Sequence, residues 1–140
     1  WRQRGDGRSY PVPLDAALTL PFLLDTLGNA LGLFDRVTEF DSVLHTVNWM
    51  ILCAGITVTW GRGRFGAAAG DGMLLMAGAG FGAIASVGWE AMEYGIMRAG
   101  VGGLHLTYAD TISDLLLSTA GGALGAWWAM HRRAASRRNR

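Results

Sequence analysis

The sequence predicts an all-α integral membrane protein, a bundle of four transmembrane helices with both termini in the cytoplasm. Hydrophobic residues make up 51% of the 140-residue chain and charged residues 16%, whereas charged residues make up about 25% of an ordinary soluble domain. Four long apolar stretches follow one another with short polar connections, as expected of helices that cross a bilayer in succession. The arginines are concentrated in alternate connections, which is typical of a multi-pass membrane protein.

We expect one transmembrane domain between two basic terminal segments. A helix needs about 20 residues to cross a hydrocarbon core of about 30 Å. The predicted spans are residues 14–34, 42–60, 73–97 and 110–130. They form a domain over residues 14–130, with a basic N-terminal arm at residues 1–13 and a basic cytoplasmic tail at residues 131–140.

The four spans are not equally apolar. The first is the least apolar, because it contains Pro21, Asp25 and Asn29. The third and fourth contain long stretches without any charge, residues 73–87 and 115–130. A soluble four-helix bundle is the alternative fold, but each of its helices would carry a polar stripe along its whole length. The uncharged stretches therefore favour a membrane bundle.

The charges of the connecting segments predict the orientation of the bundle. Ten of the twelve arginines lie in the N-terminal arm, the turn at residues 61–72 and the C-terminal tail; the acids at this end are Asp6, Asp71 and, at the start of the first span, Asp15. The opposite ends of the spans hold two arginines and seven acids: Arg36, Arg98, Asp35, Glu39, Asp41, Glu90, Glu93, Asp110 and Asp114. Because short cytoplasmic connections carry the excess of arginine, we place both termini in the cytoplasm. The arginine tail is expected to anchor lipid headgroups, and no nucleic-acid partner is expected.

Acidic residues and one histidine are spaced at helical intervals near the outer ends of the spans. Each pair lies three or four residues apart, so its members share one face of a helix. Lipid cannot solvate these side chains, so the faces that carry them are expected to turn toward one another. We therefore predict one outward-facing acidic pocket and six candidate metal ligands: Asp41, His45, Glu90, Glu93, Asp110 and Asp114.

Several uncompensated acids would approach the whole stability of a small domain, about 5–15 kcal/mol, so their charge must be neutralised. A divalent metal ion is one solution, because carboxylates and imidazole together suit Zn, Mn or Fe and oxygen ligands alone suit Mg or Ca. The alternative is that Arg36, Arg98 and a charged His45 pair with the acids and lock the bundle. A third solution is bound protons. The sequence leaves these three open.

Other conspicuous residues have simpler interpretations. Cys53 is the only cysteine and is expected to be an inert packing residue. His105, in a Gly-rich loop, is expected at the surface. Gly121 and Gly125 are expected to face a neighbouring helix, because small residues four apart allow close backbone approach. Three aromatic residues are expected to be interfacial anchors: Trp89, Tyr94 and Tyr108.

Three motifs resemble a group of uncharacterised bacterial multi-pass inner-membrane proteins, the YjdF-like proteins, whose pattern is similar to that of the VanZ-like family. The motifs are Asp41-Ser-Val-Leu-His45, Trp89-Glu-Ala-Met-Glu-Tyr94, and Asp110-Thr-Ile-Ser-Asp114 followed by Gly121-Gly-Ala-Leu-Gly125. VanZ-like proteins tend to have Gln where Glu93 stands, so the first group matches more closely. The resemblance covers roughly residues 35–126. It implies an inner-membrane location and no particular reaction.

Three functions are compatible with these features. The first is binding of a divalent metal or another cation in the acidic pocket. The second is a structural or assembly role in a larger membrane complex, with other membrane subunits as partners. The third is a metal-dependent enzyme for an envelope lipid or cell-wall substrate, in which Glu90 or Glu93 would act as base beside the metal. The sequence leaves enzymatic activity open, because no nucleophile motif is present.

Overall fold

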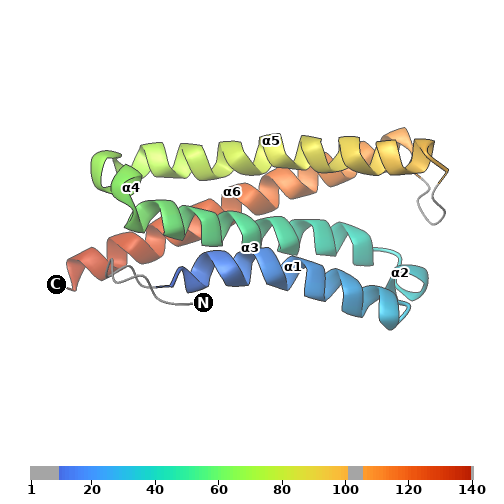
Figure 1. Ribbon diagram of the computed structural model, residues 1–140, viewed down its shortest axis with the longest axis horizontal. Coiled ribbons are helices and arrows are strands. Elements are labelled where there is room, and N and C mark those ends of the chain that lie inside the picture. The colour runs from blue at the N-terminus through green and yellow to red at the C-terminus, as the bar shows by residue number, and fades with distance from the viewer. Residues whose placement is uncertain (1–9, 101–105, 140) are drawn as a thin grey trace.

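The computed structural model describes residues 10–100 and 106–139, and this part of the chain contains helices and no strand. Four long helices lie side by side, and two short helices occupy connections between them (Figure 1). In chain order they are α1 (Val12–Ala30), α2 (Leu33–Arg36), α3 (Phe40–Arg62), α4 (Arg64–Ala68), α5 (Asp71–Arg98) and α6 (Tyr108–Arg138). The predicted all-helical fold is thereby confirmed.

Local sequence explains where α1 and α6 begin and where α1 ends. α1 has proline in its first turn, where the missing N–H would have no partner in any case. It ends at Ala30, before the predicted end of the first span at Phe34, because Gly32 adopts a left-handed φ of 65° and turns the chain into α2. α6 starts after Thr107, whose side-chain oxygen accepts a hydrogen bond from the backbone N–H of Asp110 at 3.2 Å.

Helical structure extends further at the basic segments than the sequence predicted. The predicted tail at residues 131–140 continues α6 as far as Arg138. Between Ala126 and Arg138 the chain has no Gly or Pro and is rich in alanine and arginine, which are good helix formers. The predicted turn at residues 61–72 likewise contains α4.

α3 is the central helix, because α1, α5 and α6 all pack against it. Close contact with α6 depends on Gly121 and Gly125: a Cβ atom there would collide with the carbonyl oxygens of Thr46 and Met50 on α3. The predicted packing role of this pair is confirmed. Cys53 is fully buried, and its sulfur would lie 2.8 Å from a Cβ placed on Gly82 of α5, as expected of a packing residue.

The two ends of the bundle carry different charges. The acidic end comprises α2, the start of α3, the end of α5 and the start of α6; the basic end comprises α4 and the end of α6 (Figure 1). At the basic end, Arg137 bonds Asp71 at 3.3 Å, and Arg133 donates to the carbonyl oxygen of Gly66 at 2.7 Å. These contacts tie the last turns of α6 to α4 and the start of α5.

Two of the described helices, α3 and α5, are long and apolar enough to cross a membrane. Only 33% of the most apolar window of α3 and 22% of that of α5 are buried within the protein, so most of their apolar surface faces outward. Exposed apolar side chains such as Met76 and Ile84 on α5 and Leu116 on α6 belong to this surface. α1 and α6 do not meet this criterion: α1 contains Pro and Asp, and α6 contains two Asp residues near its start and several Arg residues near its end.

Candidate functional site

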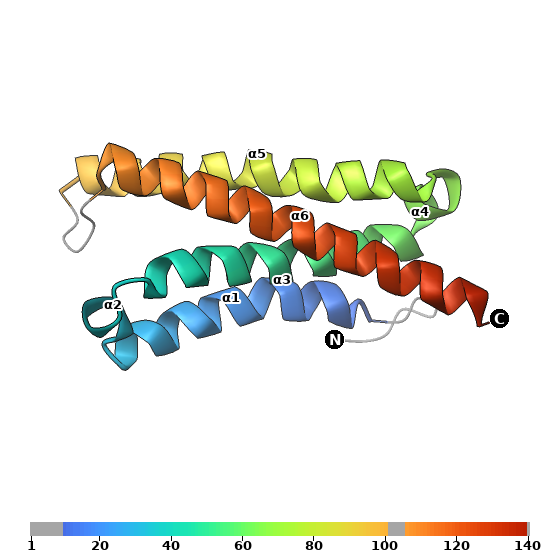
Figure 2. The same cartoon turned by 180° about the vertical axis from the view of Figure 1, so that it is seen from behind.

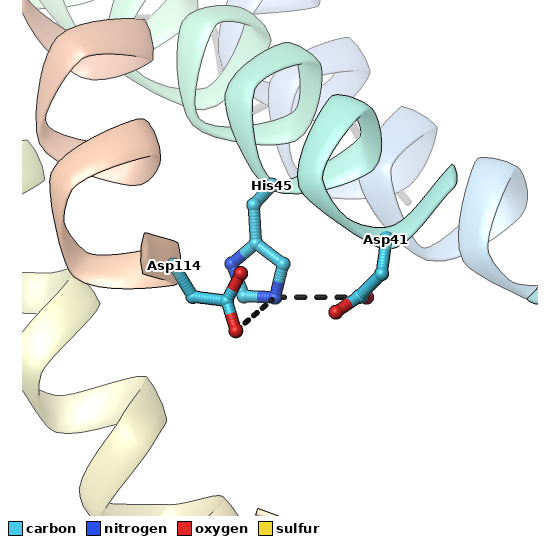
Figure 3. A group of neighbouring side chains, drawn as sticks. All are labelled: Asp41, His45 and Asp114. Atoms are coloured by element: carbon cyan, nitrogen blue, oxygen red, sulfur yellow. Dashed lines mark ion pairs between the residues drawn. The ribbon is translucent and has the colours of Figure 1, made fainter. Parts of the chain in front are cut away.

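His45 lies at the centre of a cluster of acidic side chains at the acidic end. It projects from the second turn of α3, and its Nδ1 is 3.1 Å from the hydroxyl oxygen of Ser118 on α6. Its Nε2 is 3.8 Å from Oδ1 of Asp41, one turn earlier on α3, and 4.0 Å from Oδ2 of Asp114 on α6 (Figure 3). One imidazole therefore lies between two carboxylates that come from different helices.

Two more carboxylates approach His45 from α5. His45, Glu90 and Glu93 each offer one ligand atom within 4.8 Å of the others, as do Asp41, His45 and Asp114. Glu90 is only 5% exposed and Asp114 only 3%. The Oε2 atom of Glu90 is buried and has no hydrogen-bond partner among the described residues. The cluster thus contains a buried carboxylate oxygen that no described residue satisfies.

Helix packing brings these residues together. On α6, Asp114, Ser118 and Gly121 are all buried, and Gly121 allows α6 to approach the backbone of α3 closely. On α5, Gly82, Ser86 and Glu90 follow at intervals of four and are also buried, which places them on one face of the helix. The small residues allow the helices to approach each other closely. Polar residues on the same helix faces then lie close to His45.

Five of the six candidate ligands predicted from the sequence belong to these two groups. Asp110 does not: it is exposed in the first turn of α6. A carboxylate near a helix N-terminus interacts favourably with the helix dipole, so this position has a sufficient structural explanation. His105 lies outside the described residues.

Among the described residues, neither Arg36 nor Arg98 lies within ion-pair distance of an acid, and the ion pairs of the cluster all involve His45. Of the alternative in which Arg36, Arg98 and a charged His45 pair with the acids, only the His45 contacts are found in the described part of the chain. The sequence suggested ion pairs with these arginines because both lie at the same ends of the spans as the acids. Position along a helix does not specify the direction in which a side chain points around it.

A cavity of about 250 Å³ lies beside the cluster, between α1, α3 and α5. Apolar side chains make up most of its wall, and the polar residues that line it are Asp25, Asp41, His45, Asn48 and Glu93. Trp89, which the sequence suggested as an interfacial anchor, lines this cavity with its ring centroid 6.4 Å from that of Phe22 on α1. The apolar part of the wall was missed from the sequence, because its residues resemble ordinary lipid-facing or core positions.

Comparison with known proteins supplies the family. No curated protein matches the chain, and no solved structure matches it. Residues 9–135 match the model of the family described as "Predicted membrane protein (DUF2238)". This match supports the YjdF-like part of the resemblance, whereas the similarity to VanZ-like proteins stays a prediction. Since the match covers most of the sequence, the chain belongs to this family of predicted membrane proteins.

Proposed function

We propose that the protein binds one divalent metal ion in the cluster around His45, in a pocket that faces away from the cytoplasm. The observation that carries the proposal is the buried Oε2 atom of Glu90, which has no hydrogen-bond partner among the described residues. Buried charged groups in proteins are normally paired or coordinate a metal. His45 and Glu93 present further ligand atoms within 4.8 Å, so a bound ion would satisfy this oxygen.

The charge balance of the cluster supports a cation. Asp41, Glu90, Glu93 and Asp114 gather around a single imidazole, and no arginine pairs with them within the described ranges. An acid at mid-membrane costs about 2.5–3.5 kcal/mol on insertion scales, and carboxylates in one site repel each other. A divalent ion offsets two negative charges at once, whereas a protonated His45 offsets one.

The surroundings of His45 suit a metal ligand. A ligating histidine usually donates its other ring N–H to a hydrogen-bond acceptor, which fixes its tautomer. The Ser118 hydroxyl, 3.1 Å from Nδ1, is such an acceptor. Nε2 would then be the coordinating atom, and it lies 3.8 Å from Asp41 and 4.0 Å from Asp114. Because imidazole joined to carboxylates suits Zn, Mn or Fe, we propose a transition metal rather than Mg or Ca.

Metal binding to the purified full chain tests this proposal. The protein is stripped with a chelator and titrated with MnCl₂ while electron paramagnetic resonance measures free Mn²⁺; ZnCl₂ is then added as a competitor. We expect one ion per chain, and a strong loss of affinity in His45→Gln and in Glu90→Gln. Asp110→Asn is the matched control, because it removes an acid from the same end of the bundle but from neither group of ligands.

Two results would contradict the proposal. One is a wild-type chain that binds no Mn²⁺ or Zn²⁺ above the level of the double variant His45→Gln/Glu90→Gln. The other is an equal loss of affinity in Asp110→Asn, which would indicate diffuse attraction of cations to an acidic surface. Normal elution of each variant on size-exclusion chromatography shows that a loss of binding does not reflect misfolding.

We also propose that all four long helices cross the inner membrane, with both termini in the cytoplasm. The concentration of arginine in the terminal segments and at residues 61–72 supports this orientation. α1 and α6 lie alongside α3, which is itself apolar enough to span (Figure 2). A reporter that works only in the cytoplasm should be active when it is fused after Arg140, and a reporter that works only outside the cytoplasm should be inactive there. The opposite result would refute the orientation.

A metal-dependent enzyme is the second candidate function. The cavity of about 250 Å³ beside His45 and Glu93 favours it, because a catalytic metal needs an open coordination position next to space for a substrate. Water-proton relaxation by bound Mn²⁺ distinguishes the cases: exchanging water on the ion supports this candidate, and a fully protein-ligated ion contradicts it. The structural-subunit alternative stays open: Gly121 and Gly125 are used for packing within the chain, whereas Gly80 and Gly88 on α5 have no neighbour within 4 Å of an added Cβ.

A further inference from the structure

A second and larger cavity lies at the basic end, away from the cluster around His45. Its volume is about 820 Å³, and its walls come from α1, α3 and α6. Four arginines line it: Arg62, Arg132, Arg133 and Arg137. No acidic residue is among the described residues that line it.

The arginines of this cavity are only partly neutralised. Asp71, outside the cavity wall, is 3.3 Å from Nη1 of Arg137 and 3.8 Å from Nε of Arg133. Arg62 and Arg132 have no carboxylate within ion-pair distance in the described ranges. Nη1 of Arg133 is buried and lacks a hydrogen-bond partner there. The cavity therefore has a net positive charge.

Polarity changes along the length of the cavity. On α3 the wall runs from Ile51 and Val58 to Arg62 at the helix end. On α6 it runs from Trp128 to Arg137, toward the C-terminal end of that helix. Apolar side chains thus line the part nearer the middle of the bundle, and guanidinium groups line the part nearer its end. An occupant with one anionic end and an apolar body would match both parts.

We propose that this cavity binds an anionic phospholipid, with its phosphate among the arginines and an acyl chain against the apolar wall. Guanidinium groups bind phosphate through paired N–H donors, and a basic pocket between membrane helices is suited to anionic headgroups. The apolar wall argues against a free inorganic anion, which would leave Ile51 and Trp128 facing an empty or water-filled space. The proposal is independent of metal binding at the other end.

Native mass spectrometry of the full chain in detergent tests the proposal. Phosphatidylglycerol and phosphatidylcholine of the same acyl composition are added separately at equal concentration. We expect the protein to bind phosphatidylglycerol at least about tenfold more strongly, a difference of about 1.4 kcal/mol. The preference should disappear in Arg62→Gln/Arg132→Gln. The matched control is Arg64→Gln/Arg138→Gln, which removes two exposed arginines from the same end that do not line the cavity and should keep the preference.

Three outcomes would overturn the proposal: equal binding of the two lipids, an equal loss of preference in the control double variant, or displacement of phosphatidylglycerol by inorganic phosphate at the same concentration. The last outcome would indicate a free-anion site. If the Arg62→Gln/Arg132→Gln variant fails to fold, Arg132→Gln alone decides, because Arg132 has no ion pair within the described ranges that its loss would break. Retention of the full lipid preference in Arg132→Gln would then count against the site.

Discussion

Replacement of Glu90 by Gln separates the effect of charge in the cluster from the effect of shape. Gln has nearly the same volume as Glu, so packing against α3 and α6 is kept while one negative charge is removed. Glu90 is 5% exposed, and its Oε2 has no partner in the described part of the chain. Without metal, an ionised Glu90 would be a buried charge that repels Glu93 and Asp114. The variant should be more stable than the wild type when metal is absent.

The size of this gain follows from the position of Glu90. It lies two turns before the end of α5 at Arg98, so its cost is below the about 2.5–3.5 kcal/mol of an acid at mid-membrane. We expect a gain of about 1–2 kcal/mol, and each kcal/mol raises the unfolding midpoint by roughly 2–4 °C in a chain near this size. With metal the order should reverse, because an ion at 100 times its dissociation constant stabilises the wild type by about 2.7 kcal/mol.

Thermal unfolding followed by circular dichroism, with chelator and then with MnCl₂, measures both values. Glu39→Gln is the control, because Glu39 is exposed at the same end of the bundle and should change neither midpoint. A chelated Glu90→Gln protein that unfolds at a lower temperature than the wild type would refute the reasoning. It would mean that the ionised Glu90 has a stabilising partner within the protein and that no metal is needed to explain it.

Three further expectations concern packing, pH and the orientation of His45. Gly125→Leu should destabilise the protein by about 1–3 kcal/mol through overpacking, because the new side chain would collide with the Met50 carbonyl. The control Gly88→Leu should not destabilise it, because a side chain at Gly88 has open space. Equal unfolding midpoints of the two variants would contradict the packing. Mn²⁺ affinity should fall as pH decreases from 7.5 to 5.5, because protons compete for the ligands, and a pH-independent affinity in the same titration would contradict direct coordination. Ser118→Ala should weaken Mn²⁺ binding by about 10–100-fold through loss of the acceptor for His45, and unchanged affinity would show that Ser118 does not orient the ring.

The sequence predicted most of the cluster because helical spacing specifies which residues share a face. Glu90 lies three residues from Glu93, and Asp41 lies four from His45; each pair meets as expected. Spacing failed for Asp110, although it lies four residues before Asp114. At the first turn of a helix a side chain can point into solvent beyond the bundle, so it need not share the environment of a residue one turn deeper.

The sequence does not specify which side of each helix faces which neighbouring helix. Trp89 follows the general rule for aromatic residues near helix ends, yet it lines the cavity against Phe22. Successive side chains on a helix point about 100° apart. Because Glu90 points into the cluster, Trp89 points in a different direction. Which helix Trp89 contacts there depends on how α1 packs against the bundle. The same limit applies to Arg36 and Arg98, whose sequence positions suggested ion pairs that are not seen in the described part of the chain.

The length of α6 has a consequence for the membrane around it. The helix has 31 residues and is thus about 46 Å long at 1.5 Å per residue. Asp114 is buried, so the uncharged stretch of the outward face lies between Asp110 and His131 and is about 30 Å long. α6 also runs obliquely to α3 and α5 (Figure 2), which shortens its reach across a bilayer further. In the proposed topology, a hydrocarbon core of about 30 Å would exceed the apolar height of this face by the amount that its oblique course takes away. Such a hydrophobic mismatch is relieved when the bilayer thins locally, at a cost of fractions of a kcal/mol per Å. Lipids with short acyl chains would therefore gather preferentially along α6, and bilayer thickness would influence how firmly α6 holds Asp114 and Ser118 against His45.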